Sequence, residues 1–237
     1  MKFTLLIPTL NEVDGMKVIL PKIRREWVDE ILVIDANSTD GSFEYAQSLG
    51  FKAVRQKSKG LANAYREAGD IALGDVIIPF SPDGNSVAER LPELVAKMKE
   101  GYDMVIVSRY LPGAINEDDT PMTRVGNWFF TALINLLFKG RYTDSLVMYR
   151  GWKKELVARF NLNTSIAGYE PQLAIQCAIH GLKVTEIPGD EPARLFGERK
   201  TAPIPAAFVI LWLIVVEYAK LFNTKTVAAS AKTRVGV

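Results

Sequence analysis

Cysteine and histidine are nearly absent from this sequence, which contains one of each in 237 residues. Cys177 cannot form an internal disulfide or a cysteine-based zinc site, so we interpret it as a small core residue in a reducing compartment. His180 stands just before Gly181 at the end of a helical pattern, and we expect it at a helix C-terminus. Neither residue indicates a catalytic triad or a thiol nucleophile.

An excess of charge of one sign is also missing. The 29 lysine and arginine residues nearly balance the 27 aspartate and glutamate residues, and the formal net charge is +2. This balance gives no bulk electrostatic reason to expect nucleic-acid binding. The first apolar run, which ends at Pro8, is too short for a signal peptide and is soon followed by polar Asn11 and Glu12, so we expect a first β-strand there.

Two common nucleotide-binding motifs are missing as well. The sequence has no Gly-x-Gly-x-x-Gly after its first apolar run and no phosphate-loop lysine motif. The usual signatures of dinucleotide-binding and P-loop proteins are therefore excluded. A nucleotide that binds to this chain must be held in another way.

The first half of the chain alternates short apolar runs with longer amphipathic runs. This alternation predicts an α/β fold, with a mostly parallel, Rossmann-like sheet covered by helices on both faces. The predicted strands are Phe3 to Ile7, Ile31 to Ile34, Ala53 to Val54, Val76 to Phe80 and Met104 to Val107. The predicted helices are Val13 to Trp27, Ser42 to Leu49, Leu61 to Leu73 and Val87 to Met98.

Polar residues gather directly after four of these strands, at 8–12, 35–41, 81–85 and 108–110. Because ligands of open parallel sheets bind outside the carboxyl ends of the strands, we expect these segments to form one site. Asp35 also suits a plainer role, in which it closes a strand and its neighbours cap the next helix.

The second half of the chain has a less regular pattern, which begins with a polar loop from Leu111 to Pro121. We predict a helix from about Thr123 to Phe138, a strand at Asp144 to Arg150, a helix at Tyr169 to His180, a strand at Lys183 to Pro188 and a charged loop from Gly189 to Lys200.

The run from Thr201 to Val216 carries no charge, and its second half is apolar on every side. We expect its helix to begin at about Pro205, and Glu217 then interrupts it. It is thus short of the roughly 20 residues that cross a bilayer core. We predict that 201–223 lies on a membrane or packs against protein, a second copy of the chain included, and that 224–237 is a flexible tail.

Three segments resemble glycosyltransferase family 2 in order and spacing, namely 8–12, 35–42 and 59–64. Further positions resemble its polyprenyl-phosphate branch, which is typified by dolichyl-phosphate mannosyltransferase. These positions are Val107 to Tyr110, Arg124 with Gly126 and Asn127, Asp144, Glu170 and 194–200. The resemblance covers about Lys2 to Lys200 and implies a GT-A-type domain at 1–200.

The resemblance also implies roles for single residues. The residues that would border the nucleotide of a nucleoside-diphosphate sugar are Pro8, Glu12, Asp35, Asn37 and Gly60. Asp83 and Asn85 would hold Mg²⁺ or Mn²⁺ on the diphosphate. The family usually shows Asp-x-Asp here, whereas Ser81 replaces the first carboxylate in this sequence. We expect weaker metal binding, because one carboxylate, an amide oxygen, waters and substrate phosphates can still hold such a cation.

The acceptor decides which other side chains the reaction needs. Departure of a nucleoside diphosphate develops negative charge, and a phosphate acceptor, already ionised, needs positioning rather than a general base. A hydroxyl acceptor would instead need a carboxylate base. The candidate cations are Arg109, Arg124, Arg194 and Lys200, each of which also suits a solvated surface charge. The candidate bases are Asp83, Asp144 and Glu170, of which Asp144 and Glu170 are placed on the acceptor side.

Taken together, these features predict metal-assisted, inverting transfer of a hexose from a nucleoside-diphosphate sugar to a polyprenyl phosphate. We expect the protein at the cytoplasmic face of a membrane, peripheral or shallowly inserted. Two alternatives stay open. One is a transferase that acts on a soluble hydroxyl acceptor, and the other is a catalytically silent nucleotide-sugar-binding module, which the replacement at Ser81 would suit.

Overall fold

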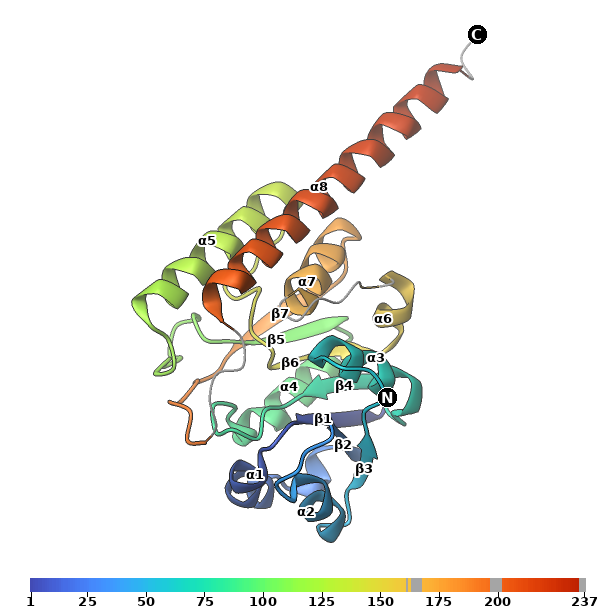
Figure 1. The fold of residues 1–237 in the computed structure, drawn as a ribbon. Coiled ribbons are helices and arrows are strands. Elements are labelled where there is room, and N and C mark those ends of the chain that lie inside the picture. Colours follow the sequence, from blue (N-terminus) through green and yellow to red (C-terminus); the bar gives the residue numbers. More distant parts are fainter. Residues whose placement is uncertain (161, 163–167, 197–201, 235–237) are drawn as a thin grey trace.

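The computed structural model describes residues 1–160, 162, 168–196 and 202–234, with side chains as far as Leu221. Within these residues one seven-stranded sheet has the strand order β3-β2-β1-β4-β6-β5-β7, with helices on both faces (Figure 1). Only β6 runs antiparallel to its neighbours, β4 and β5. The strands are β1 (Phe3–Thr9), β2 (Glu30–Asp35), β3 (Lys52–Arg55), β4 (Val76–Pro79), β5 (Met104–Ser108), β6 (Arg150–Lys153) and β7 (Val184–Pro188).

The central strands are buried on both faces, as their unbroken runs of valine, isoleucine and leucine require. Helix α3 packs against β1 and β2, and α4 packs against β5, β6 and β7. The predicted α/β fold with a mostly parallel sheet is therefore confirmed. The helices are α1 (Val13–Ile19), α2 (Ser42–Ser48), α3 (Leu61–Ile71), α4 (Leu91–Lys99), α5 (Pro121–Phe138), α6 (Glu155–Phe160), α7 (Tyr169–Ile179) and α8 (Pro203–Arg234).

The first predicted helix is shorter than expected. Helix α1 ends at Ile19, and two 3₁₀ turns follow, at Leu20–Lys22 and Arg25–Trp27. Pro21 explains the break, because proline has no amide hydrogen to continue the α-helical hydrogen bonds.

The strand predicted at Asp144 to Arg150 is wrong, because β6 begins only at Arg150. The Asp144 carboxylate accepts the backbone N–H groups of Leu146, at 3.3 Å, and Val147, at 3.1 Å. An aspartate that satisfies its own following backbone in this way competes with strand pairing. The segment forms a turn instead, and this turn becomes part of the site.

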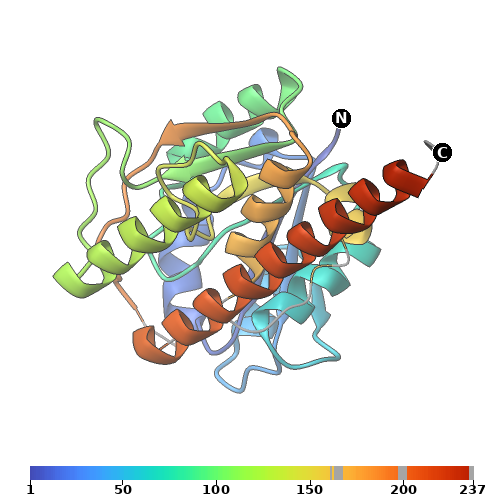
Figure 2. The same cartoon turned by 90° about the horizontal axis from the view of Figure 1, so that it is seen from above.

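The last helix, α8, begins at Pro203 and passes beside α5 and α7 (Figures 1 and 2). Its Pro203–Leu221 part is long and apolar enough to cross a membrane by length and composition, so the expectation that the segment is too short is wrong. The helix continues to Arg234, and the flexibility predicted for 224–237 stays a prediction.

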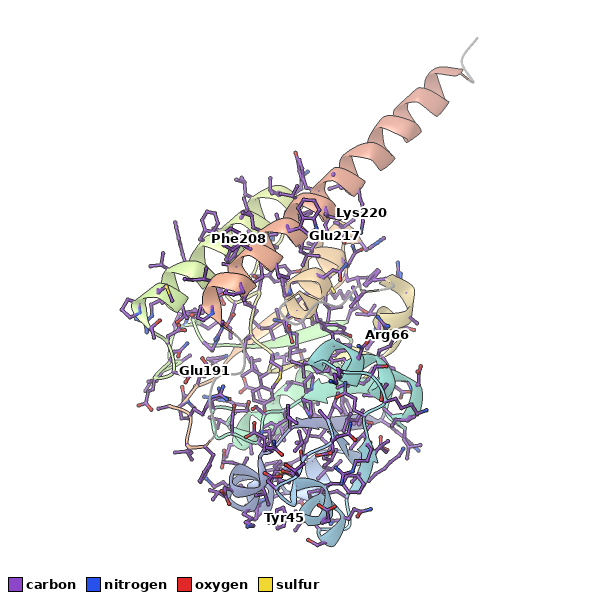
Figure 3. The ribbon with its side chains drawn as sticks, viewed as in Figure 1. Tyr45, Arg66, Glu191, Phe208, Glu217 and Lys220 are labelled. Atoms are coloured by element: carbon purple, nitrogen blue, oxygen red, sulfur yellow. The ribbon has the colours of Figure 1, made fainter. Side chains whose placement is uncertain are left out.

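The charge that was expected to interrupt this helix is satisfied inside the protein. Glu217, labelled on α8 in Figure 3, is 2% exposed. Its carboxylate accepts hydrogen bonds from Gln172, at 2.9 Å, and Gln176, at 2.8 Å, both on α7. Lys220 lies 3.0 Å from the same carboxylate. Because Glu217 faces the domain, it leaves the outer side of α8 apolar and fixes the rotation of the helix.

Candidate functional site

A cavity of about 440 Å³ opens at the carboxyl ends of β1, β2, β4 and β5. The polar segments that follow these strands all contribute to its wall, as the sequence predicts. This nucleotide-side cavity, as we call it, is also bordered by the start of α3 and by the loop after β7. Predicted site residues in its wall are Pro8, Glu12, Gly60, Asp83, Asn85, Arg109 and Arg194.

Gly60 sits at the N-terminus of α3 with φ of 102°, a conformation that favours glycine and brings the backbone close to the cavity. Asp35 and Asn37 were also predicted to border the nucleotide, but neither is among the described residues of this wall. Asp35 is fully buried, ends β2, and its carboxylate accepts the Ser38 backbone N–H at 2.9 Å, as the plainer role expects. The N-cap residue of α2 is Gly41, without a side-chain capping hydrogen bond, so the helix-capping part of that role is wrong. Asn37 is exposed and lies beside Gln56.

Sequence reasoning missed Arg55, which lies opposite Asp35 in the parallel register of β2 and β3. Its guanidinium donates to the Asp35 carboxylate at 2.6 Å and stacks 4.0 Å from the centre of the Phe43 ring. The sequence did contain a signal for this pair. Arg55 is a basic residue directly after one predicted strand, and Asp35 is an acidic residue directly after the preceding predicted strand. Arg55 therefore fixes the Asp35 carboxylate behind the cavity wall.

Asp83 lies in a tight turn after β4, next to Gly84, which has φ of 100°. One Asp83 oxygen accepts the Asn85 backbone N–H at 3.2 Å, and the other is 2.7 Å from Nη1 of Arg194. The loop after β7 reaches this turn with its backbone too, because the Leu195 N–H donates to the Asp83 carbonyl at 3.0 Å. The predicted metal ligand is thus ion-paired to a predicted phosphate-binding cation.

The side chains around Asp83 fit a metal that the substrate helps to hold. In the described part of the chain no group of three or more histidine, cysteine, aspartate or glutamate side chains converges on one point. Ser81, Asp83 and Asn85 do line one side of the cavity, and the Asp83 side chain is only 5% exposed. One carboxylate with neighbouring neutral oxygens suits Mg²⁺ or Mn²⁺ completed by phosphate oxygens.

Arg109, just after β5, is held by two carboxylates. Its Nε and Nη2 donate to both oxygens of Asp144, at 2.6 and 2.9 Å, and its Nη1 donates to Glu191 at 3.0 Å. Asn127 of α5 donates to Asp144 as well, at 3.0 Å. Burial by itself would raise the pKa of the Asp144 carboxyl, but the charge and hydrogen bonds of Arg109, together with the Asn127 hydrogen bond and the charge of Arg150, outweigh it. The pKa of this carboxyl therefore lies below its ordinary value.

These hydrogen bonds join four separate parts of the chain. Glu191, which Figure 3 labels, is a member of the group that sequence reasoning missed. Asp144 is a member rather than an open acceptor-side carboxylate, because it is completely buried. Arg124 stands apart, since it is exposed on α5 and is not among the described residues lining either cavity. Lys200 lies outside the described residues.

A second cavity, of about 430 Å³, adjoins the first. It runs between α5, the start of α7 and the start of α8, and we call it the acceptor-side cavity. Leu61, Asn85, Val147, Met148, Glu191 and the arginines Arg109 and Arg194 belong to both walls. Apolar side chains in its wall include Met122, Phe130, Leu146, Ile204, Ala207 and Ile210, and the carboxylates Asp118 and Asp119 line it too.

Glu170, at the start of α7, lines the acceptor-side cavity as the sequence predicts. It is 7% exposed, and one of its oxygens accepts the Tyr65 hydroxyl at 3.1 Å. Burial raises the pKa of the Glu170 carboxyl above its ordinary value, and the nearby charge of the buried Arg150 opposes this only in part.

Replacement of Glu170 by glutamine should change how stability depends on pH. A carboxyl whose folded-state pKa is raised contributes stability below its unfolded pKa of about 4.3, and this stability is lost as pH rises through the folded-state pKa. Glutamine keeps a hydrogen-bond acceptor for Tyr65 but does not titrate. The melting temperature of E170Q relative to the parent should therefore increase as pH rises from 4 to 8. Parallel melting curves across this range would contradict a raised pKa.

Comparison with known proteins agrees with this geometry. The sequence matches the family described as Glycosyl transferase family 2 over residues 4–163. It is 31% identical over 188 residues to "Glycosyltransferase AglJ" of Haloferax volcanii, covering 78% of this chain and 61% of that protein. It is 30% identical over 219 residues to "Dolichol-phosphate mannosyltransferase" of Pyrococcus furiosus, covering 84% and 59%. The chain therefore spans about three fifths of the length of these two relatives.

A further relative has a length closer to that of this chain. "Undecaprenyl-phosphate mannosyltransferase" of Micrococcus luteus is 24% identical over 213 residues, covering 84% of this chain and 87% of that protein. The relatives' names confirm the predicted resemblance to the polyprenyl-phosphate branch.

The structure resembles that of glucosyl-3-phosphoglycerate synthase from Mycobacterium tuberculosis, solved in complex with Mn²⁺, uridine diphosphate and phosphoglyceric acid. The TM-score is 0.71 at 18% sequence identity, and the likeness covers 92% of this chain and 78% of the other. It confirms the expected GT-A-type fold. Since the family match spans most of the sequence, this chain belongs to glycosyltransferase family 2.

Proposed function

We propose that this protein transfers a hexose from a nucleoside-diphosphate sugar to a polyprenyl phosphate at the cytoplasmic face of a membrane. The observation that carries the proposal is the pair of adjoining cavities, which share the two arginines Arg109 and Arg194. One cavity lies where a family 2 donor is expected, and the other is lined both by these arginines and by apolar side chains of α5 and α8. An acceptor with a phosphate head and a hydrocarbon chain fits the second cavity.

The names of the relatives support the same acceptor, since they include transferases of dolichol phosphate and undecaprenyl phosphate. The solved structure with Mn²⁺ and uridine diphosphate supports a diphosphate donor and a divalent metal. In this chain Asp83, with Asn85 and Ser81 beside it, would hold the metal, which when bound neutralises charge on the departing diphosphate.

A phosphate acceptor also agrees with the state of the three carboxylates predicted as candidate bases, although Asp118 and Asp119 line the acceptor-side cavity as well. Asp83 is paired with Arg194, and Asp144 is fully buried and holds Arg109. Glu170 is buried beside Tyr65, and its raised pKa favours the protonated form relative to an ordinary glutamate. A hydroxyl acceptor needs a carboxylate placed to take its proton, whereas an ionised phosphate needs only cations and correct positioning.

The outer side of α5 and α8 supports a position on the membrane. Glu217 binds this part of α8 to the domain, so the helix cannot be surrounded by lipid on all sides and is proposed to lie in the interface. Several of the exposed residues are aromatic, the type enriched at membrane interfaces. Exposed apolar residues of this α5–α8 face are Met122, Val125, Trp128, Phe129, Leu136, Ile204, Phe208, Leu211, Trp212, Val215 and Tyr218.

Placing charges on the α5–α8 face should weaken membrane binding without unfolding the protein. Phe208 and Trp212 are each 70% exposed, so the double variant F208E/W212E loses no core packing. We expect its binding to anionic liposomes in a flotation assay to fall at least about tenfold, because two apolar anchors become charges. L73E alters a similarly exposed apolar residue away from this face and should bind like the parent. Equal binding of all three proteins would contradict the membrane placement.

The proposed activity is tested by a donor screen with the purified chain. Nucleoside-diphosphate hexoses are offered with and without polyprenyl phosphate, and with and without Mn²⁺. Release of nucleoside diphosphate that requires both additions supports the proposal. Transfer to a soluble hydroxyl acceptor instead favours the first alternative, and donor binding without turnover favours the silent binding module.

A further inference from the structure

The two cations that line both cavities are neutralised by carboxylates. Among the described residues of the two walls, Arg109 and Arg194 are the cationic ones. Arg109 faces Asp144 and Glu191, and Arg194 faces Asp83. In this state the described side chains offer little net positive charge to an incoming phosphate. The proposed function nevertheless requires a positively charged site for the acceptor phosphate.

The pairing of Arg194 differs from that of Arg109 in one respect, because its partner is the proposed metal ligand. Nη1 of Arg194 lies 2.7 Å from one Asp83 carboxylate oxygen, and the Asn85 backbone N–H donates to the other oxygen. Mg²⁺ binds oxygen at about 2.0 to 2.1 Å, so the metal and the guanidinium would compete for the same carboxylate as like charges. Arg109 has no such competitor at its fully buried partner Asp144.

The backbone on either side of Arg194 is held in place independently of its side chain. The N–H groups of Leu195 and Phe196 donate to the Asp83 carbonyl, at 3.0 and 3.4 Å, and the Glu191 N–H donates to the Ile115 carbonyl at 2.9 Å. A guanidinium that leaves Asp83 therefore stays at the junction of the two cavities, with both of which Arg194 is already in contact.

We propose that Arg194 is displaced from Asp83 when the metal binds and then contacts the acceptor phosphate, so that loading the donor side prepares the acceptor side. The inference rests on the proposed function and adds a coupling between metal binding on the donor side and phosphate binding on the acceptor side. Such a coupling is reciprocal, because a metal that strengthens phosphate binding is itself bound more strongly when phosphate is present.

Metal binding alone gives the first test. Removing Arg194 leaves a buried carboxylate without its cation, so R194A should bind Mn²⁺ about tenfold more tightly than the parent when no substrate is present, measured by electron paramagnetic resonance. R194K should lie between the two. R24A removes an exposed arginine away from both cavities and should bind Mn²⁺ like the parent. Thermal unfolding checks that each variant is folded.

The second test measures the affinity of the protein for a short-chain prenyl phosphate in detergent micelles, without donor. Mn²⁺ should increase its affinity for the parent and for R24A, and the increase should be reduced at least about fivefold in R194A, within the range of known couplings. Unchanged or weaker Mn²⁺ binding by R194A, or a coupling as large as that of the parent, overturns the inference.

The two tests separate this inference from the proposed function. A parent protein that transfers sugar to lipid phosphate while R194A binds Mn²⁺ like the parent leaves the function in place and refutes the displacement. Tighter Mn²⁺ binding by R194A with the coupling reduced at least about fivefold supports the displacement, whichever donor sugar is used.

Discussion

Replacement of Asp83 by asparagine should abolish metal-dependent turnover, with a loss of at least about a hundredfold. Asp83 supplies the carboxylate of the turn after β4, and its side chain is almost entirely enclosed beside the nucleotide-side cavity. Asparagine preserves shape but removes the charge that holds a divalent cation. Initial rates over a range of Mn²⁺ concentrations, together with Mn²⁺ binding, measure the effect.

Two matched variants sharpen this result. Asp190 lines the same cavity, and its carboxylate accepts the backbone N–H of Ile115. The variant D190N removes this carboxylate and should keep turnover within about threefold of the parent. S81D restores the first carboxylate of the family pattern and should bind Mn²⁺ more tightly than the parent. Parent-like turnover and metal affinity in D83N would refute Asp83 as the metal ligand.

Replacement of Arg109 by alanine should destabilise the protein strongly as well as affect catalysis. The Arg109 side chain is 14% exposed and its removal leaves the fully buried Asp144 without a cation. Breaking a buried ion pair in this way costs roughly 3 to 5 kcal/mol. For a protein of this size that corresponds to a fall in melting temperature of about 6 to 20 °C.

A double variant distinguishes an unpaired buried charge from lost packing. R109A/D144N removes both charges and should recover part of the stability lost in R109A, because no ionised carboxylate is left alone in the interior. R124A, at an exposed arginine of α5, should unfold within about 2 °C of the parent. A fall of less than about 2 °C for R109A would show that the ion pairs seen around Asp144 do not hold the fold together.

The order of strands and helices in the first half could be predicted from sequence because each strand is a short buried apolar run followed by a polar turn. This regularity also located Pro8, Glu12 and Asp83 at one cavity, since parallel strands end at the same edge of the sheet, whereas Gly60 was expected there only from the resemblance to family 2. The pattern failed after β5, where β6 enters the sheet antiparallel and the turn at Asp144 is stabilised by side-chain hydrogen bonds.

Hydrogen bonds and ion pairs between residues far apart in the sequence could not be predicted in the same way. Glu191 meets Arg109 across 82 positions of sequence, and Glu217 meets Gln172 across 45. Each charge, seen alone, suits a solvated surface equally well. The acceptor-side cavity has the same origin, because it exists only where α5, α7 and α8 pack together.

The acceptor is the central claim, and one competition assay tests it most directly. The purified protein is given a turnover-competent nucleoside-diphosphate hexose, Mn²⁺, and equal amounts of a prenyl phosphate and the prenyl alcohol of the same chain length, and the products are separated by mass. We predict glycosyl phosphate as the product, with at most about 1% of the transfer to the alcohol, because the alcohol has no negative charge to pair with the arginines and must also lose its proton to a base. Equal or greater transfer to the alcohol would contradict the account.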